Sequence, residues 1–140
     1  MLVPQEGEFE IEIDGKKFAG DRSGGPFAVS PGGSNASAVY IPCNARFGIR
    51  GKGEMAFYEA PALEENTPFF VPKEEAQAVS RGEWVWRRDV INLVSPKNAS
   101  SNLIVGETYN PPGFWSGTPI HRHDNDQPSQ GESDHEEIYY

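Results

Sequence analysis

The chain has 140 residues, of which 12 are Lys or Arg and 21 are Asp or Glu, and its formal charge is −9. Nucleic acid and anionic membranes are therefore not expected as partners, because binding to phosphates requires a basic surface. Gly and Pro contribute 15 and 12 residues, and no window shows a sustained helical period. This composition predicts an all-β domain of short strands.

Cys43 is the single cysteine. One thiol cannot form an internal disulfide, so a reducing compartment is the default. The first residues contain neither the basic region nor the apolar stretch of a signal peptide. We therefore predict a cytoplasmic protein.

The N-terminal block predicts an antiparallel meander. Residues 8–13 alternate strictly between acidic and apolar side chains, and Asp14-Gly15 follows, which is a strong signal for a two-residue hairpin turn. The apolar face of this strand consists of Phe9, Ile11 and Ile13. Further short strands are predicted at residues 38–41, 46–50 and 54–58.

A second strand-rich block follows a linker. Residues 59–73 contain three prolines and show no periodicity, which is typical of a connection between two blocks. Residues 74–79 could form one helical turn. Long strands are predicted at residues 84–94 and 103–109.

The sequence ends on Ile138-Tyr139-Tyr140, an apolar aromatic run without a polar tail. A domain rarely stops within a buried strand, because the exposed edge would invite aggregation. We therefore expect further sequence after Tyr140, and we consider it before Met1 as well.

Two histidines flank Arg122 in the chemically most informative part of the chain. On a strand, the spacing of His121 and His123 places both imidazoles on one face, which suits two nitrogen ligands of a single metal ion. Glu136 and Glu137 are candidates for an anionic third ligand, and only one of them can point inward. The alternative is a surface loop that merely contains histidines, but all three histidines of the chain fall between residues 121 and 135, which favours a metal site.

His135 competes with Glu137 for the third position, since both would share a strand face. We predict that Glu137 is the ligand and that His135 lies outside the ligand set, because a carboxylate suits a metal that keeps open positions. Zinc is the expected ion, and manganese and iron accept the same ligands.

Three stretches together resemble the 5-deoxy-glucuronate isomerase family of myo-inositol catabolism, which is related to 4-deoxy-L-threo-5-hexosulose-uronate ketol-isomerase. They are Gly106–Ser116 (GETYNPPGFWS), Pro119–Asp124 (PIHRHD) and Glu136–Tyr140 (EEIYY). Weaker similarity extends upstream, so that most of the chain is covered. The family is bicupin, with two double-stranded β-barrels and a metal in the C-terminal one.

The resemblance implies an incomplete all-β cupin with three parts. Residues 1–58 would form the C-terminal part of the first cupin barrel, residues 59–75 a linker, and residues 76–140 the N-terminal part of the second, metal-binding barrel. Neither barrel would be whole.

The resemblance also makes His121, His123 and Glu137 metal ligands. It implies a fourth ligand, a histidine on a later strand that lies beyond this sequence. Two departures are visible. Thirteen residues separate His123 from Glu137, whereas the general cupin pattern has only a few, and Phe114 stands where a polar residue is expected.

The implied activity is aldose–ketose isomerisation of a deoxy uronic acid, from 5-deoxy-glucuronate to 2-deoxy-5-keto-gluconate. An open-sided metal would act as a Lewis acid, the partner would be a small sugar acid, and the general base is not identified. The fragment alone is expected to bind metal weakly and to be inactive. The alternatives are a non-catalytic sugar-binding or regulatory cupin and an iron-dependent oxygenase. The strand edges of a cupin could also pair between subunits in a homo-oligomer.

Overall fold

The computed structural model describes residues 1–29, 33–95, 100–117 and 120–140. Within them the regular elements are strands and two short 3₁₀ helices, in the order β1 (Leu2–Ile13), β2 (Lys16–Arg22), β3 (Ala38–Tyr40), β4 (Phe47–Phe57), β5 (Phe69–Val71), β6 (Ala78–Arg81), η1 (Trp84–Trp86), β7 (Arg88–Val94), β8 (Val105–Tyr109) and η2 (Pro128–Gln130). The all-β prediction is confirmed for this part of the chain. None of its helices is long and apolar enough to cross a membrane.

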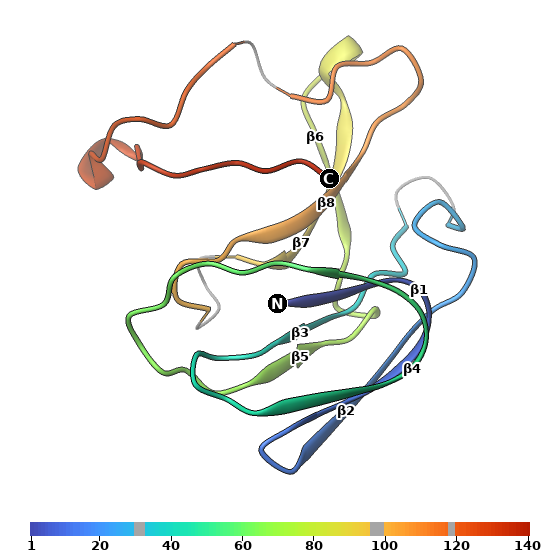
Figure 1. Ribbon diagram of the computed structural model, residues 1–140. Coiled ribbons are helices and arrows are strands. Elements are labelled where there is room, and N and C mark those ends of the chain that lie inside the picture. The colour runs from blue at the N-terminus through green and yellow to red at the C-terminus, as the bar shows by residue number, and fades with distance from the viewer. Residues whose placement is uncertain (30–32, 96–99, 118–119) are drawn as a thin grey trace.

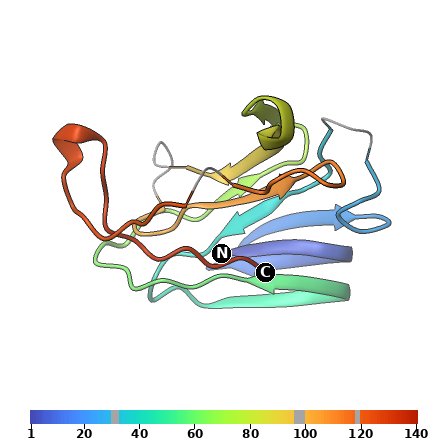
Figure 2. The same ribbon diagram turned by 90° about the horizontal axis from the view of Figure 1, so that it is seen from above.

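The strands form two antiparallel sheets. The larger sheet has the order β2-β1-β3-β5, with β4 paired to β1, and the smaller has the order β6-β7-β8. Figure 1 shows the larger sheet curling around its own concave side, and Figure 2 shows the smaller sheet lying against it. The curled sheets make half of a barrel, which confirms the predicted incomplete cupin.

The predicted N-terminal hairpin is present. Strands β1 and β2 pair from Gly7↔Arg22 to Ile13↔Lys16 around the Asp14-Gly15 turn. Ile11 and Ile13 are at most 1% exposed, as their alternation with the glutamates predicts. This apolar face packs on β3 and supports the rest of the sheet.

Strand β4 bends back on itself. An extended strand of this length would span about 33 Å, yet the rings of Phe47 and Phe57 at its two ends stack with centroids 6.2 Å apart. Figure 1 shows the green strand following β1 around the bend. Gly7, Gly51 and Gly53 lie at this bend with φ values of 101°, 143° and 146°, which favour glycine.

This bend corrects one prediction. Residues 46–50 and 54–58 are not two strands joined by a turn, because Gly51 and Gly53 stay in register with Phe9 and Gly7 of β1. The glycines therefore curve a continuous ribbon. A local sequence window cannot distinguish such a curve from a turn.

Two further predictions in the second block are wrong. The strand predicted over residues 84–94 begins only at Arg88, because Gly82 and Trp84 have positive φ values and η1 connects β6 to β7. The helical turn predicted at residues 74–79 is a turn followed by β6, in which Ala78 pairs with Ile91. Pairing with β7 decides the conformation there.

The two strand-rich blocks share one hydrophobic core. Strand β5, which lies within the predicted linker, pairs with β3, so the linker is partly a strand. The buried cluster that joins both blocks comprises Met1, Val3, Ala36, Ala38, Tyr40, Val71, Ala76, Ile91, Leu93, Val94 and Val105. The assignment of these blocks to two different cupin barrels stays a prediction.

Candidate metal centre

The histidine-bearing segment follows β8 and returns toward the sheets. Within residues 110–117 and 120–140 it contains η2 and an isolated bridge between Gln127 and Glu132, but no longer strand. His121 and His123 therefore do not lie on a strand, contrary to the prediction, and neither do the final residues. Pro119, the first residue of the PIHRHD stretch, lies outside the described residues.

The segment folds back so that the stretch after residue 134 lies next to the stretch before residue 124. The excursion over residues 124–134 is closed by the bridge of Gln127 and Glu132, and the backbone N–H of His135 donates to the carbonyl oxygen of His123 at 3.1 Å. Figure 1 shows the chain running out in orange-red, turning back at η2, and returning in red toward the C-terminus. The long insertion between the histidine pair and Glu137 is therefore compatible with their proximity.

The three side chains predicted as metal ligands converge. One ligand atom from each of His121, His123 and Glu137 lies within 4.8 Å of the others. His123 Nε2 and Glu137 Oε1 are 3.8 Å apart, and the two imidazole rings meet edge to face with centroids 4.9 Å apart. The set combines two neutral nitrogen donors with one anionic oxygen donor, which suits a divalent cation.

The separations fit a metal after small movements. Bonds of about 2.1 Å place tetrahedral ligand atoms about 3.4 Å apart, and neighbouring octahedral ligand atoms about 3.0 Å apart. The 3.8 Å between His123 and Glu137 exceeds the tetrahedral separation by about 0.4 Å. The separations within the triad reach at most 4.8 Å, so a tetrahedral ion requires a closure of up to about 1.4 Å, which exposed side chains can make by rotation.

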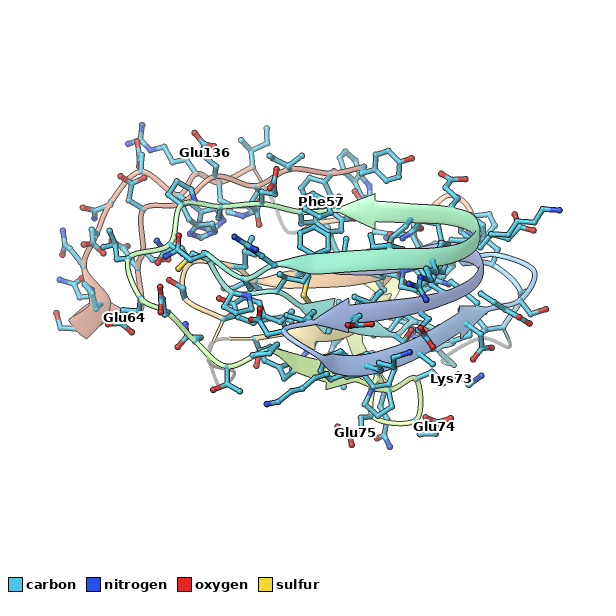
Figure 3. The ribbon with its side chains drawn as sticks, turned by 60° about the horizontal axis from the view of Figure 1, so that its bottom comes forward. Phe57, Glu64, Lys73, Glu74, Glu75 and Glu136 are labelled. Atoms are coloured by element: carbon cyan, nitrogen blue, oxygen red, sulfur yellow. The ribbon has the colours of Figure 1, made fainter. Side chains whose placement is uncertain are left out.

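The side chains beside the triad point elsewhere. Figure 3 shows Glu136 projecting outward from the C-terminal segment, which leaves Glu137 as the carboxylate near the histidines. Arg122 lies between the histidines but turns away and pairs with Asp124 at 3.3 Å. The triad itself remains open to solvent, since the Glu137 side chain is 44% exposed. An open side is what a metal needs in order to exchange water for substrate.

The connection between β8 and the histidines is held by backbone contacts. The backbone N–H of Trp115 donates to the Val85 carbonyl at 2.7 Å, and the Asn110 amide donates to the Trp115 carbonyl at 2.8 Å. The rings of Trp115 and Trp86 also pack together, with centroids 5.3 Å apart. Because Val85 and Trp86 belong to η1, these contacts fix the loop to the β6–β7 connection.

A buried arginine that pairs with β8 was missed by the sequence reasoning. Arg22 ends β2 and is 0% exposed, yet each of its five N–H donors has an acceptor. The acceptors are Asn35 Oδ1, the Pro4 carbonyl, both carboxylate oxygens of Glu107 and the Tyr109 hydroxyl, at 2.6–3.0 Å. This network joins the larger sheet to β8. Its one sequence signal is Glu107 and Tyr109 at i and i+2, which share a face of β8.

Burial and the neighbouring Glu107 carboxylate raise the pKa of Tyr109 to about 12 from its ordinary value of 10.0. Its hydroxyl lies 2.9 Å from Glu107 Oε2 and 2.8 Å from the Pro26 carbonyl oxygen. Loss of the phenolic proton would place a second negative charge against this carboxylate. The protonated hydroxyl is therefore the form that the folded chain stabilises.

We expect the free energy of unfolding to fall as the pH rises from 10 toward 12. The folded chain holds the Tyr109 proton to higher pH than the unfolded chain does, so this stabilisation is complete below pH 10 and is lost as the pH passes the folded pKa. Urea unfolding at a series of alkaline pH values measures the effect. The Tyr109→Phe variant should show a shallower alkaline decline, and an unchanged decline would contradict the assignment.

Comparison with known proteins agrees with the family resemblance of the sequence. The model of the KduI/IolB family matches residues 1–140. The chain is 32% identical over 106 residues to a 5-deoxy-glucuronate isomerase of Bacillus licheniformis, covering 74% of this chain and 39% of that protein. It is also 32% identical over 145 residues to the enzyme of that name from Lacticaseibacillus casei, covering 99% of this chain and 51% of that protein.

The chain thus spans between about two fifths and half of the length of these relatives. No solved structure matches the chain significantly. The match to the family model extends over all 140 residues of this chain. The chain belongs to the KduI/IolB family.

Proposed function

We propose that this chain provides metal ligands for a sugar-acid isomerase that converts 5-deoxy-glucuronate to 2-deoxy-5-keto-gluconate in inositol catabolism. The observation that carries the proposal is the convergence of His121, His123 and Glu137 within 4.8 Å. The names of the relatives support the reaction, since they are 5-deoxy-glucuronate isomerases. The cytoplasm is the proposed compartment, and zinc is the proposed ion.

The ligand set explains how such a site could serve this reaction. Aldose–ketose isomerisation moves a proton between adjacent carbons, so negative charge develops on the carbonyl oxygen of the substrate. A divalent cation bound to a site with open positions polarises that oxygen as a Lewis acid. His121, His123 and Glu137 would hold such a cation from one side, and the exposed side of the triad would admit the sugar acid. Residues of this chain that move the proton are not assigned.

We expect the His123→Ala variant of the full-length protein to lose its bound metal and its isomerase turnover. The substitution removes the residue that contacts both His121 and Glu137, so two ligands remain and they lack the central imidazole. Metal content measured by elemental analysis, together with an assay of 5-deoxy-glucuronate conversion, tests this expectation.

Arg122→Ala is the matched control for metal content, because Arg122 lies between the histidines and pairs away from them with Asp124. It should retain the metal. Retained metal in the His123→Ala variant would reject the ligand assignment. Metal binding and sugar binding without turnover in the unsubstituted full-length protein would instead support a non-catalytic sugar-binding cupin, and oxygen uptake would support an oxygenase.

A further inference from the structure

We infer that His135 is a positioning residue that holds the His123 imidazole in its metal-binding orientation, an inference that rests on the proposed function. The two rings stack with centroids 3.9 Å apart and an angle of 32° between their planes. No other described ring lies so close to a member of the triad. The ring of His121 lies perpendicular to that of His123, with centroids 4.9 Å apart, so His123 has a ring neighbour in both histidines.

The stack shows that His135 cannot share an ion with His123 in this arrangement. A metal binds an imidazole nitrogen along the lone pair, which lies in the plane of the ring. The two ring planes are inclined by 32° and their centroids are 3.9 Å apart, so the planes converge only at about 6 Å or more from the ring centres. An ion about 2.1 Å from a ring nitrogen lies about 3 Å from the ring centre, so the two lone pairs do not meet at one ion. The ligand atoms that converge with His123 are those of His121 and Glu137, and His135 is not among them.

His135 is itself anchored by Ser133 and by the backbone of His123. Its Nδ1 lies 3.0 Å from Ser133 Oγ and 3.2 Å from the Ser133 carbonyl oxygen. Its backbone N–H donates to the His123 carbonyl at 3.1 Å. The backbone bond brings the arm of Glu137 next to His123, and the ring of His135 then covers one face of the imidazole.

The backbone and the side chain of His135 have separate effects: the backbone bond keeps Glu137 near the histidines, and the ring orients the His123 imidazole. The backbone contact survives any substitution of the His135 side chain, so Glu137 stays near the histidines. Only the orientation of the His123 ring depends on the imidazole of His135. A flat aromatic side chain without a metal-binding atom should therefore orient the His123 ring as well as the His135 imidazole does.

The experiment measures cobalt(II) binding to the full-length protein by competition with a chelator. His135→Ala should weaken binding between about threefold and tenfold, which is the range of an aromatic stacking contact. His135→Phe should restore the affinity to within about threefold of the unsubstituted protein. The cobalt absorption bands of His135→Phe should match those of the unsubstituted protein, since the ligand set is unchanged.

Two results would overturn the inference. Unchanged affinity in His135→Ala would show that the stack does not orient His123. Affinity as weak in His135→Phe as in His135→Ala, with shifted cobalt bands in both, would show that His135 is a ligand.

A measurement without metal separates this inference from the proposed function. In the metal-free protein, the ring current of His135 should shift the His123 imidazole proton resonances, and His135→Ala should remove that shift. If the shift is present but no variant binds cobalt, the proposed metal function fails while the stack stands. If the shift is absent, the positioning role fails whatever the metal affinity.

Discussion

Replacing Arg22 with methionine should lower the free energy of unfolding by about 3–5 kcal/mol, because it removes one partner of a buried ion pair. The Glu107 carboxylate would lose two short charge-assisted hydrogen bonds of 2.6 and 2.7 Å while its side chain remains only 16% exposed. Asn35 and the Pro4 carbonyl would also lose their donor. Urea unfolding followed by tryptophan fluorescence measures the loss.

Two control variants test whether the loss of stability comes from breaking a buried ion pair. Lys17→Met removes a solvent-exposed ion pair with Glu10, and such pairs contribute about 1 kcal/mol or less. The double variant Arg22→Met, Glu107→Leu removes both buried charges and should be more stable than Arg22→Met alone, since an apolar pair can replace a buried ion pair at little cost. If the double variant is the less stable of the two, Glu107 stabilises the fold through a partner other than Arg22, such as the Tyr109 hydroxyl.

Replacing Gly53 with alanine should destabilise the chain by about 3 kcal/mol or more, since both its backbone conformation and its surroundings reject a side chain. Gly53 has a φ of 146°, and a Cβ there would overlap the Glu6 carbonyl of the paired strand. The ribbon of β1 and β4 would have to separate at its bend. Thermal and urea unfolding of the variant measure this cost.

Gly48→Ala is the matched control on the same strand. No atom lies within 4 Å of a Cβ added at Gly48, so its replacement should change the free energy of unfolding by less than about 1 kcal/mol. Equal effects of the two substitutions would show that loss of glycine flexibility, and not the bend, determines the stability of β4.

The site was predictable from sequence to the extent that its chemistry is local. The spacing of His121 and His123 predicts a pair of neighbouring nitrogen donors, and the structure brings them together with Glu137. The prediction that the two histidines lie on a strand was wrong. The excursion that returns His135 to His123 is instead closed by contacts between Gln127 and Glu132. Such contacts leave no periodic pattern in the sequence.

The buried network was not predictable for a similar reason. Arg22 and Glu107 are 85 positions apart, and the sequence around each one predicts only a charged side chain on the surface. They meet only because β2 and β8 belong to sheets that pack on a common core. Ionisable side chains avoid full burial unless paired, so a pairing made by tertiary packing decides their exposure.

The sequence by itself determined the all-β class, the N-terminal hairpin and the residues that can act as metal ligands. These follow from alternation, turn residues and donor chemistry, which act over a few neighbouring positions. Only the tertiary structure decided that β4 curves without breaking, that Arg22 is buried against Glu107, and that His135 covers His123. Each of these depends on contacts between segments that the packing of the two sheets and the closure of the insertion bring together.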